Sequence, residues 1–293
     1  MKNERADGMH PILPLDRASV FFDATLGPIR LKHPEGLAIA GDGAIWCGGD
    51  GGEIYRIEPD GSGIEIVANS GGFALGMAFD RQGRLYTCDL GHKAVFRLDP
   101  ASRKLDRFAT GDGNTSIKVP NYPLVDANRN CLYVSDSHAF GEPGPGVWRF
   151  DLETGAGGLW YAGTLDFANG MALSPDRNTL YIVETFGRRV SRIPIHPDGS
   201  AGDAEVFVEG IERLPDGLAF DVEGNLYISC YEPSRLFRAT PDGRLELLID
   251  DPDAHTFCHP TNCAFRGSDL FTANLGRWHI TRIEVGIQGL PLL

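Results

Sequence analysis

The chain has 293 residues, a formal net charge of −13 and an isoelectric point near 5.0. This acidic balance argues against nucleic acid and anionic membrane surfaces as partners, and no apolar run approaches the ~18 residues that span a bilayer. The opening stretch MKNERADGMHPILPLD lacks the apolar core of a signal peptide. We therefore expect a cytoplasmic protein without a membrane partner.

The first predicted element is a β-like run within residues 17–26, which contains ASVFFDATL. Behind it, 37 Gly and 19 Pro are spread along the chain, which is typical of many short strands and turns. No linker or low-complexity segment divides the sequence. We expect one domain over residues 1–293.

Six similar segments follow, beginning near residues 33, 73, 119, 167, 214 and 259. Each has a short apolar run, a polar turn, a second run such as LYVSDS or LYISC, a variable loop and an alternating strand such as VWRFDL, and most add one further strand. Four strands per segment at a regular spacing indicate a β-propeller. A β-sandwich is the alternative, but it has no reason to repeat its turns six times. We predict an all-β, six-bladed propeller with four-stranded blades.

The last segment supplies only three strands after Thr261. We expect the run at 17–26 to complete the last blade as its outer strand. This pairing closes the ring and removes two exposed sheet edges.

One position recurs just before the innermost strand of every segment. It holds, in order, Glu35, Leu75, Asn121, Asn169, Asp216 and Thr261, which are 40 to 48 residues apart. Because innermost strands line the central channel, we expect these six side chains to converge at one rim. Four of them carry the carboxylate or amide oxygens that hard cations prefer. The alternative is a solvated channel lining in which Asn-Gly and Asp-Gly only form turns.

Glycine follows Glu35, Asn169 and Asp216. We interpret it as clearance beside a ligand at a crowded axis.

The segments HPEGLA, ANGMALSPDRNTLYIVET and PDGLAFDVEGNLYIS resemble the SMP-30/gluconolactonase/LRE-like family. The resemblance implies a six-bladed propeller with a divalent cation in the channel, held by Glu35, Asn169 and Asp216. It also implies that Asn121 contacts substrate and approaches the metal. Sugar lactonases of this family commonly have Asp after that Asn and Arg shortly before it, whereas Tyr122 and Lys118 stand here. The identity of the sugar is therefore open.

This resemblance implies hydrolysis of a lactone, most simply a sugar lactone. A cation with few protein ligands keeps positions for water or substrate and polarises a carbonyl. A carboxylate then acts as general base, for which we favour Asp216 and place Glu35 second. The ligands do not choose among Ca²⁺, Zn²⁺, Mn²⁺, Mg²⁺ and Fe²⁺. We expect further substrate contacts from residues beside the channel mouth, namely Asn121, Lys118, Tyr122, His138, Glu184, Tyr231 and His259, with Asn274 as another candidate.

Other interpretations stay open. The same fold suits an esterase, a phosphotriesterase, a strictosidine-synthase-like enzyme or a non-enzymatic calcium-binding propeller. Cys258, His259 and Cys263 form a weaker candidate zinc site. The sequence has no GxSxG, HExxH or Walker motif. We expect the six cysteines to be buried free thiols and the partner to be a small lactone, and nothing in the sequence indicates an oligomeric state.

Overall fold

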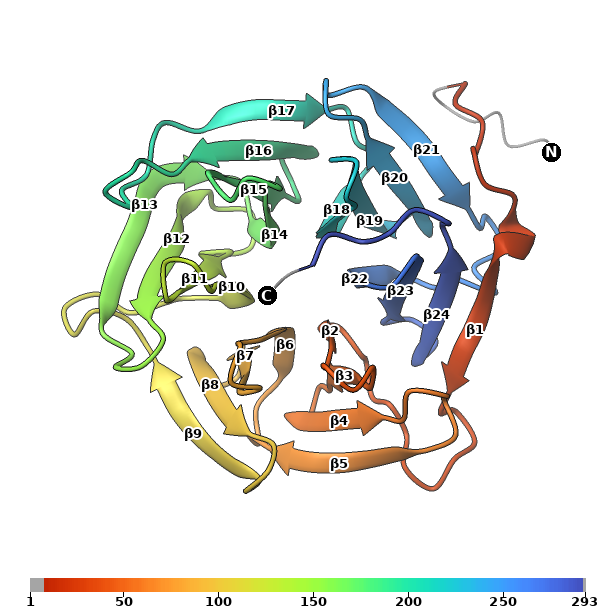
Figure 1. Cartoon of the computed structure of the whole chain (residues 1–293), viewed down its shortest axis with the longest axis horizontal. Helices are drawn as coiled ribbons and strands as arrows, with labels where there is room; N and C mark the ends of the chain where they lie inside the picture. The colour runs from red at the N-terminus through yellow and green to blue at the C-terminus, as the bar shows by residue number, and fades with distance from the viewer. Residues whose placement is uncertain (1–7, 292–293) are drawn as a thin grey trace.

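Each repeat folds as a four-stranded antiparallel sheet in the computed structural model, which describes residues 8–291. The six sheets stand around a central channel as the blades of a propeller (Figure 1). The predicted fold is therefore confirmed. Within residues 8–291, no helix has the length and hydropathy of a membrane-spanning segment.

The strands of each blade follow one another from the channel outward, except that the outer strand of the sixth blade is the first strand of the chain. The innermost strands are β2 (Leu37–Ile39), β6 (Ala74–Phe79), β10 (Pro120–Asp126), β14 (Ala168–Leu173), β18 (Leu214–Phe220) and β22 (Pro260–Arg266). The second strands are β3 (Ile45–Gly48), β7 (Leu85–Asp89), β11 (Cys131–Asp136), β15 (Thr179–Glu184), β19 (Leu226–Glu232) and β23 (Asp269–Asn274). The third strands are β4 (Glu53–Ile57), β8 (Ala94–Asp99), β12 (Gly144–Asp151), β16 (Arg189–Pro194), β20 (Arg235–Ala239) and β24 (His279–Glu284). The outer strands are β5 (Ile64–Asn69), β9 (Lys104–Ala109), β13 (Gly157–Leu165), β17 (Glu205–Glu209), β21 (Leu245–Asp250) and β1 (Ala18–Asp23).

The ring closes through β1, as predicted. This strand pairs antiparallel with β24, from Ala18 opposite Ile283 to Asp23 opposite His279. A short 3-10 helix, η1 (Leu15–Arg17), precedes it. This pairing covers the outer edge of β24, which the last repeat alone would leave unpaired.

The buried apolar clusters lie between neighbouring blades. In one of them, Tyr122 and Leu124 of β10 pack with Met171 and Leu173 of β14. Since each cluster takes side chains from two blades, every blade is held in place by both of its neighbours. All six cysteines are free, five of them buried, and Cys258 is partly exposed.

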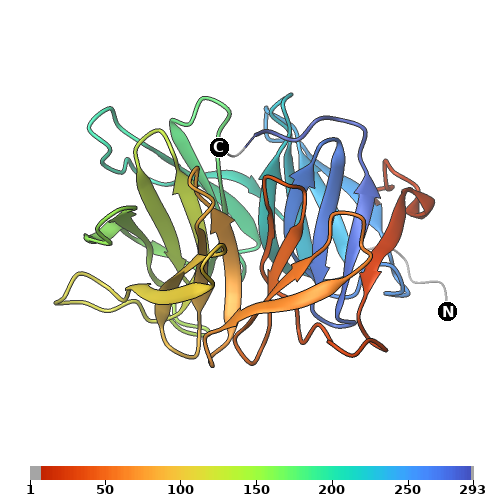
Figure 2. The same cartoon turned by 60° about the horizontal axis from the view of Figure 1, so that its bottom comes forward.

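The channel has two different ends. At one, which we call the start end, the inner strands begin and the second strands finish, because Pro120 pairs with Asp136 and Ala168 with Glu184. At the other, the turn end, each inner strand turns into its second strand. The segment after β24 crosses the turn end, where the Leu290 N–H donates to the Phe220 carbonyl over 2.8 Å (Figures 1 and 2).

Candidate metal centre in the channel

Four polar residues of the predicted column are buried at the start end of the channel. The exposed fraction is 7% for Glu35, 5% for Asn121, 3% for Asn169 and 8% for Asp216. Carboxylate and amide side chains are seldom this deeply buried unless something pairs with them. Their partners therefore decide what the site can do.

The structure corrects the position of three of these residues by two or three places. Asn121, Asn169 and Asp216 lie inside their inner strands and not just before them, whereas Glu35 precedes β2 as predicted. At each of the three positions the ladder with the second strand is interrupted by a β-bulge. The interruptions lie between Pro120 and Pro123, between Ala168 and Met171, and between Pro215 and Leu218. A bulge bends its strand and re-aims side chains, which explains how a paired strand presents ligands to the channel.

One oxygen of each of the four side chains has no hydrogen-bond partner. These atoms are Glu35 Oε2, Asn121 Oδ1, Asn169 Oδ1 and Asp216 Oδ1, all fully buried. Such an unpaired buried acceptor costs ~1–3 kcal/mol, and more when it is charged. Four of them in equivalent places of four blades form a set of oxygen acceptors that could hold a cation.

Two hydroxyl groups orient the amides. Asn121 Nδ2 donates to Ser137 Oγ over 3.2 Å, and Asn169 Nδ2 donates to Thr185 Oγ1 over 3.1 Å. Each hydroxyl in turn donates to a carbonyl of the next blade, Ser137 to Ala168 and Thr185 to Pro215. With its nitrogen held in this way, each amide keeps its oxygen free. The sequence pattern did not indicate Ser137 and Thr185, although both directly follow the second strand of their blade.

The two carboxyl groups influence each other. Burial, and then the charge of Asp216, raises the pKa of Glu35 well above its ordinary value. Burial raises the pKa of Asp216 to about 7, although the Asn169 side chain acts in the opposite direction. Both shifts have the same physical cause, which is that negative charge is unfavourable in a buried site without a counter-charge.

The donor set fits a hard divalent cation. It combines two carboxylates with two amide carbonyls, the oxygen ligands that Ca²⁺ and Mg²⁺ take in proteins. The part of the chain that the structure describes contains no group of three or more His, Cys, Asp or Glu side chains arranged as a metal site. Cys258, His259 and Cys263, the alternative zinc ligands, therefore do not converge.

The glycines after the ligands have a different role from the predicted one. A methyl group at Gly36 would overlap with the Leu75 carbonyl, and one at Gly170 would overlap with the Asp216 carbonyl. The crowding thus comes from the inner strand of the next blade. Only glycine lets two neighbouring inner strands approach so closely.

Four of the predicted substrate contacts form two pairs around the start end. Lys118 Nζ lies 3.1 Å from His138 Nε2. The Tyr231 and His259 rings are stacked with centroids 4.5 Å apart, and His259 Nδ1 lies 3.0 Å from the Tyr231 carbonyl. Burial raises the pKa of Tyr231, and the nearby charges of Glu232 and Asp216 add to this effect. Tyr231 is therefore within electrostatic range of the candidate metal ligands.

Glu184, which we expected to contact substrate, has all its acceptor positions engaged within its own blade. Its Oε1 accepts from Arg189 Nε and Ser191 Oγ, and its Oε2 accepts from Arg189 Nη2 and the Asp166 N–H. These bonds keep the pKa of Glu184 below its ordinary value, although burial alone would raise it. These bonds hold the Glu184 carboxylate against its own blade, and its role as a substrate contact stays a prediction.

The position of Glu184 recurs as a structural column at the end of the second strands. Asp136 accepts from the Lys118 and Val119 N–H groups at 2.9 and 2.8 Å. Asn274 accepts from the Cys258 N–H at 3.2 Å. These side chains fix the segments that lead into the inner strands of the third, fourth and sixth blades, and so they help to place Asn121 and Asn169.

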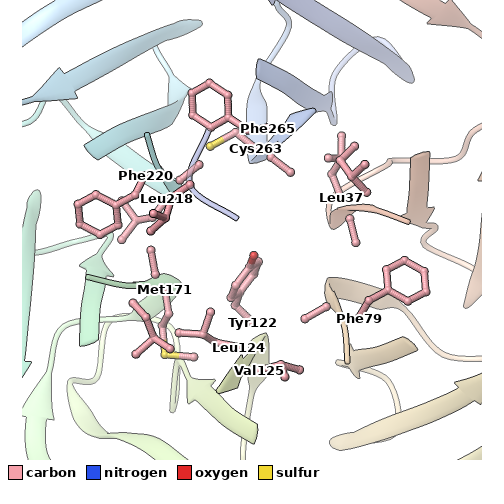
Figure 3. A pocket seen from close by; sticks show the side chains of 18 of the residues that line it. Leu37, Phe79, Tyr122, Leu124, Val125, Met171, Leu218, Phe220, Cys263 and Phe265 are labelled. Carbon is pink, nitrogen blue, oxygen red and sulfur yellow. The ribbon is translucent and has the colours of Figure 1, made fainter. Parts of the chain in front are cut away.

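Tyr122 separates the polar part of the channel from an apolar part. Its ring packs against Gly76 of the second blade, where a methyl group would lie 2.6 Å from Cδ2. Burial raises the pKa of Tyr122, and the nearby charges of Cys263 and Glu35 add to this effect. Toward the turn end lies a cavity of about 100 Å³, and Figure 3 shows Tyr122 among its apolar side chains. The lining includes Leu37, Leu124, Met171, Leu218 and Cys263, and Leu290 and Pro291 of the crossing segment.

The sequence profile of the SMP-30/Gluconolactonase/LRE-like region matches residues 72–274 of the chain. The chain is 29% identical over 221 residues to the protein strictosidine synthase-like 6 of Arabidopsis thaliana, an alignment that covers 70% of this chain and 58% of the relative. It is also 29% identical over 226 residues to the gluconolactonase of Zymomonas mobilis, covering 67% of this chain and 59% of the relative. The chain thus spans less than two thirds of the length of these curated relatives.

Among solved structures, a gluconolactonase from Xanthomonas campestris superimposes with a TM-score of 0.75. The superposition covers 93% of this chain and 89% of that one, at 22% sequence identity. At this identity the likeness establishes the shared fold.

Proposed function

The chain belongs to the SMP-30/gluconolactonase/LRE-like family, and from this premise we propose that it is a divalent-metal-dependent hydrolase of lactones. A sugar lactone is the simplest substrate, since a relative that is 29% identical is a gluconolactonase. The product is the corresponding hydroxy acid. The observation that carries the proposal is the set of four buried, unpaired oxygens on Glu35, Asn121, Asn169 and Asp216.

The four oxygens would hold one divalent cation, which when bound supplies Lewis-acid polarisation of the lactone carbonyl and activation of water. Asp216 accepts the proton of the attacking water at a carboxylate oxygen as the water oxygen bonds to the carbonyl carbon. The proton then passes to the ring oxygen as the ring C–O bond breaks. Asn121, oriented by Ser137, binds the substrate beside this carboxylate.

The electrostatics favour Asp216 over Glu35 as the general base. The charge of Asp216 contributes to the raised pKa of Glu35, so Asp216 loses its proton first. A general base must be deprotonated before it takes the proton of the water. Glu35 then remains the second candidate.

The test combines elemental analysis of the purified protein with a pH-indicator assay on five- and six-membered sugar lactones. We expect hydrolysis that EDTA abolishes and that one divalent metal restores. Asp216→Asn should reduce kcat by at least ~100-fold, as general bases contribute ~10²–10⁴-fold. Asp203→Asn is the matched control, because Asp203 is exposed and lies between β16 and β17. Full activity after EDTA treatment would contradict the proposal.

The alternatives give different results in the same panel. Aryl esters or phosphotriesters hydrolysed faster than every lactone would indicate an esterase or phosphotriesterase. Condensation or release of an amine would indicate a strictosidine-synthase-like enzyme. Metal binding that Asp216→Asn weakens, without hydrolysis of any substrate, would indicate a calcium-binding propeller.

A further inference from the structure

A patch of three phenylalanine rings lies at the rim of the start end. We call Phe140, Phe167 and Phe186 the phenylalanine patch. The Phe140 ring lies 4.9 Å from Phe186 and 6.2 Å from Phe167, and the last two rings are 4.7 Å apart. Phe140 is 84% exposed, whereas every other Phe, Tyr and Trp among residues 8–291 is at least partly buried.

The chain places this patch beside the candidate metal ligands. Phe167 comes two residues before Asn169, and Phe186 directly follows Thr185, whose hydroxyl holds the Asn169 amide. Phe140 lies in the loop between β11 and β12, and β11 ends at the start end of the channel. The three rings therefore lie at the start end, on segments of the two blades that carry Asn121 and Asn169.

Two residues of this rim have a left-handed backbone conformation. Phe167 has a φ of 62° and His138 has a φ of 63°. A bulky side chain is disfavoured in this left-handed region. The same conformation recurs at His33 and His259, two residues before Glu35 and Thr261, so it belongs to the way the chain enters an inner strand.

From this arrangement we infer that the substrate is a lactone with an apolar alkyl or aryl substituent, and that this substituent lies against the phenylalanine patch. The inference rests on the proposed function. Phenylalanine rings have no hydrogen-bonding atoms, so sugar hydroxyls placed on them would lose water without finding partners. An apolar chain instead gains from the burial of Phe140, which lies at the same end of the channel as the four oxygens.

The experiment compares δ-valerolactone with δ-lactones that carry butyl, hexyl or phenyl groups, together with an aldono-1,5-lactone, using the metal-loaded protein. We expect kcat/KM of the wild type to rise with the length of the apolar group. We define a ratio as kcat/KM for the hexyl-substituted δ-lactone divided by kcat/KM for δ-valerolactone. Phe140→Ala should lower this ratio by about fivefold to tenfold, as expected for one aromatic contact. Phe140→Tyr should retain the ratio.

Two further variants separate this effect from altered folding. Phe186→Leu keeps most of the apolar volume and should lower the same ratio by a smaller factor. Val206→Ala removes an apolar side chain that is 46% exposed on β17 and should leave the ratio unchanged. Calorimetry with a hexyl-substituted δ-lactam, which is not hydrolysed, measures binding without turnover. The affinities of the variants for this lactam should fall in the same order as their kcat/KM ratios.

The outcomes distinguish the two levels of the hypothesis. Hydrolysis of the aldonolactone without any preference for apolar groups would overturn the inference and leave the proposed function standing. A wild type that hydrolyses no lactone would overturn both. If Phe140→Ala instead converts a dimer into a monomer and leaves lactam binding unchanged, the patch is an interface between copies and the inference is wrong.

Discussion

The side-chain nitrogen of Asn169 donates to the Thr185 hydroxyl over 3.1 Å, and this contact determines which end of the amide faces the channel. Thr185→Val keeps the shape of the side chain but removes the acceptor. We expect affinity for the divalent cation to fall by about 10- to 100-fold, the usual effect of losing a group that orients a metal ligand. Calorimetric titration measures this loss. Thr185→Ser retains the hydroxyl and should restore the affinity, and equal affinity in the valine variant would argue against the amide as a ligand.

A second prediction concerns pH and metal removal. The pKa of Asp216 rises from 3.8 to about 7 on folding. A group whose pKa is higher in the folded state stabilises the fold fully below its unfolded pKa, and this contribution is lost as the pH rises through 7. Metal binding requires the deprotonated form, so a cation should stabilise the protein little at pH 5 and clearly at pH 8.

At a metal concentration 100 times the dissociation constant, we expect a gain of about 3 kcal/mol at pH 8, or roughly 5–10 °C in Tm. Thermal unfolding with EDTA and with added metal, from pH 5 to pH 8, measures the difference. Asp216→Asn should remove most of the pH dependence of this metal-induced stabilisation. A thermal shift that stays constant across this range would show that these carboxyl groups do not bind the metal.

A third prediction concerns the contact between neighbouring inner strands. Gly170→Ala places a methyl group against the Asp216 carbonyl. We expect a loss of about 2–3 kcal/mol in the free energy of unfolding, because backbone cannot move aside as a flexible side chain can. Gly41→Ala is the control, since nothing lies within 4 Å of its added methyl group. Urea unfolding compares the two, and equal stability would contradict the packing described above.

A fourth prediction separates a structural from a ligand-binding role for Glu184. Its partner Arg189 is 36% exposed at the side chain, which weakens the ion pair through solvent screening. We therefore expect Glu184→Gln to cost about 2 kcal/mol of stability, below the ~3–5 kcal/mol typical of a fully buried pair. KM for the lactone should not change.

The control for Glu184 is Glu205→Gln, which breaks an exposed pair with Arg192. This change should cost less than ~1 kcal/mol. A rise in KM in the Glu184 variant, without loss of stability, would restore Glu184 as a substrate contact.

The fold could be predicted from the sequence because each repeat of the sequence forms one blade. Six segments with the same order of strands and turns define the blades, and the three-stranded last segment points to β1 as the missing strand. The convergence of Glu35, Asn121, Asn169 and Asp216 followed from their equivalent positions. Their roles as metal ligands and base stay predictions, as do the cytoplasmic location and the single domain.

The remaining features depend on contacts that spacing does not encode. The sequence places Glu184 near the channel mouth. It does not reveal that the Glu184 carboxylate bonds to Arg189 and Ser191 of the neighbouring strand. The bulges at Asn121 and Asn169 arise from strand pairing. Phe140 and Phe186 meet across two loops of different blades, and no local pattern predicts such a contact.

The joint between β1 and β24 has a consequence for how the protein is made. Arg17 donates through Nη2 to the Glu284 carbonyl over 3.0 Å, across 267 positions of the sequence. During synthesis, β1 leaves the ribosome long before its only sheet partner exists, so the sixth blade is the last to assemble. Contacts of such long range slow folding. A defect at this joint would therefore appear first as a lower yield of protein in cells, while the molecules that do mature would keep their ordinary catalytic rate.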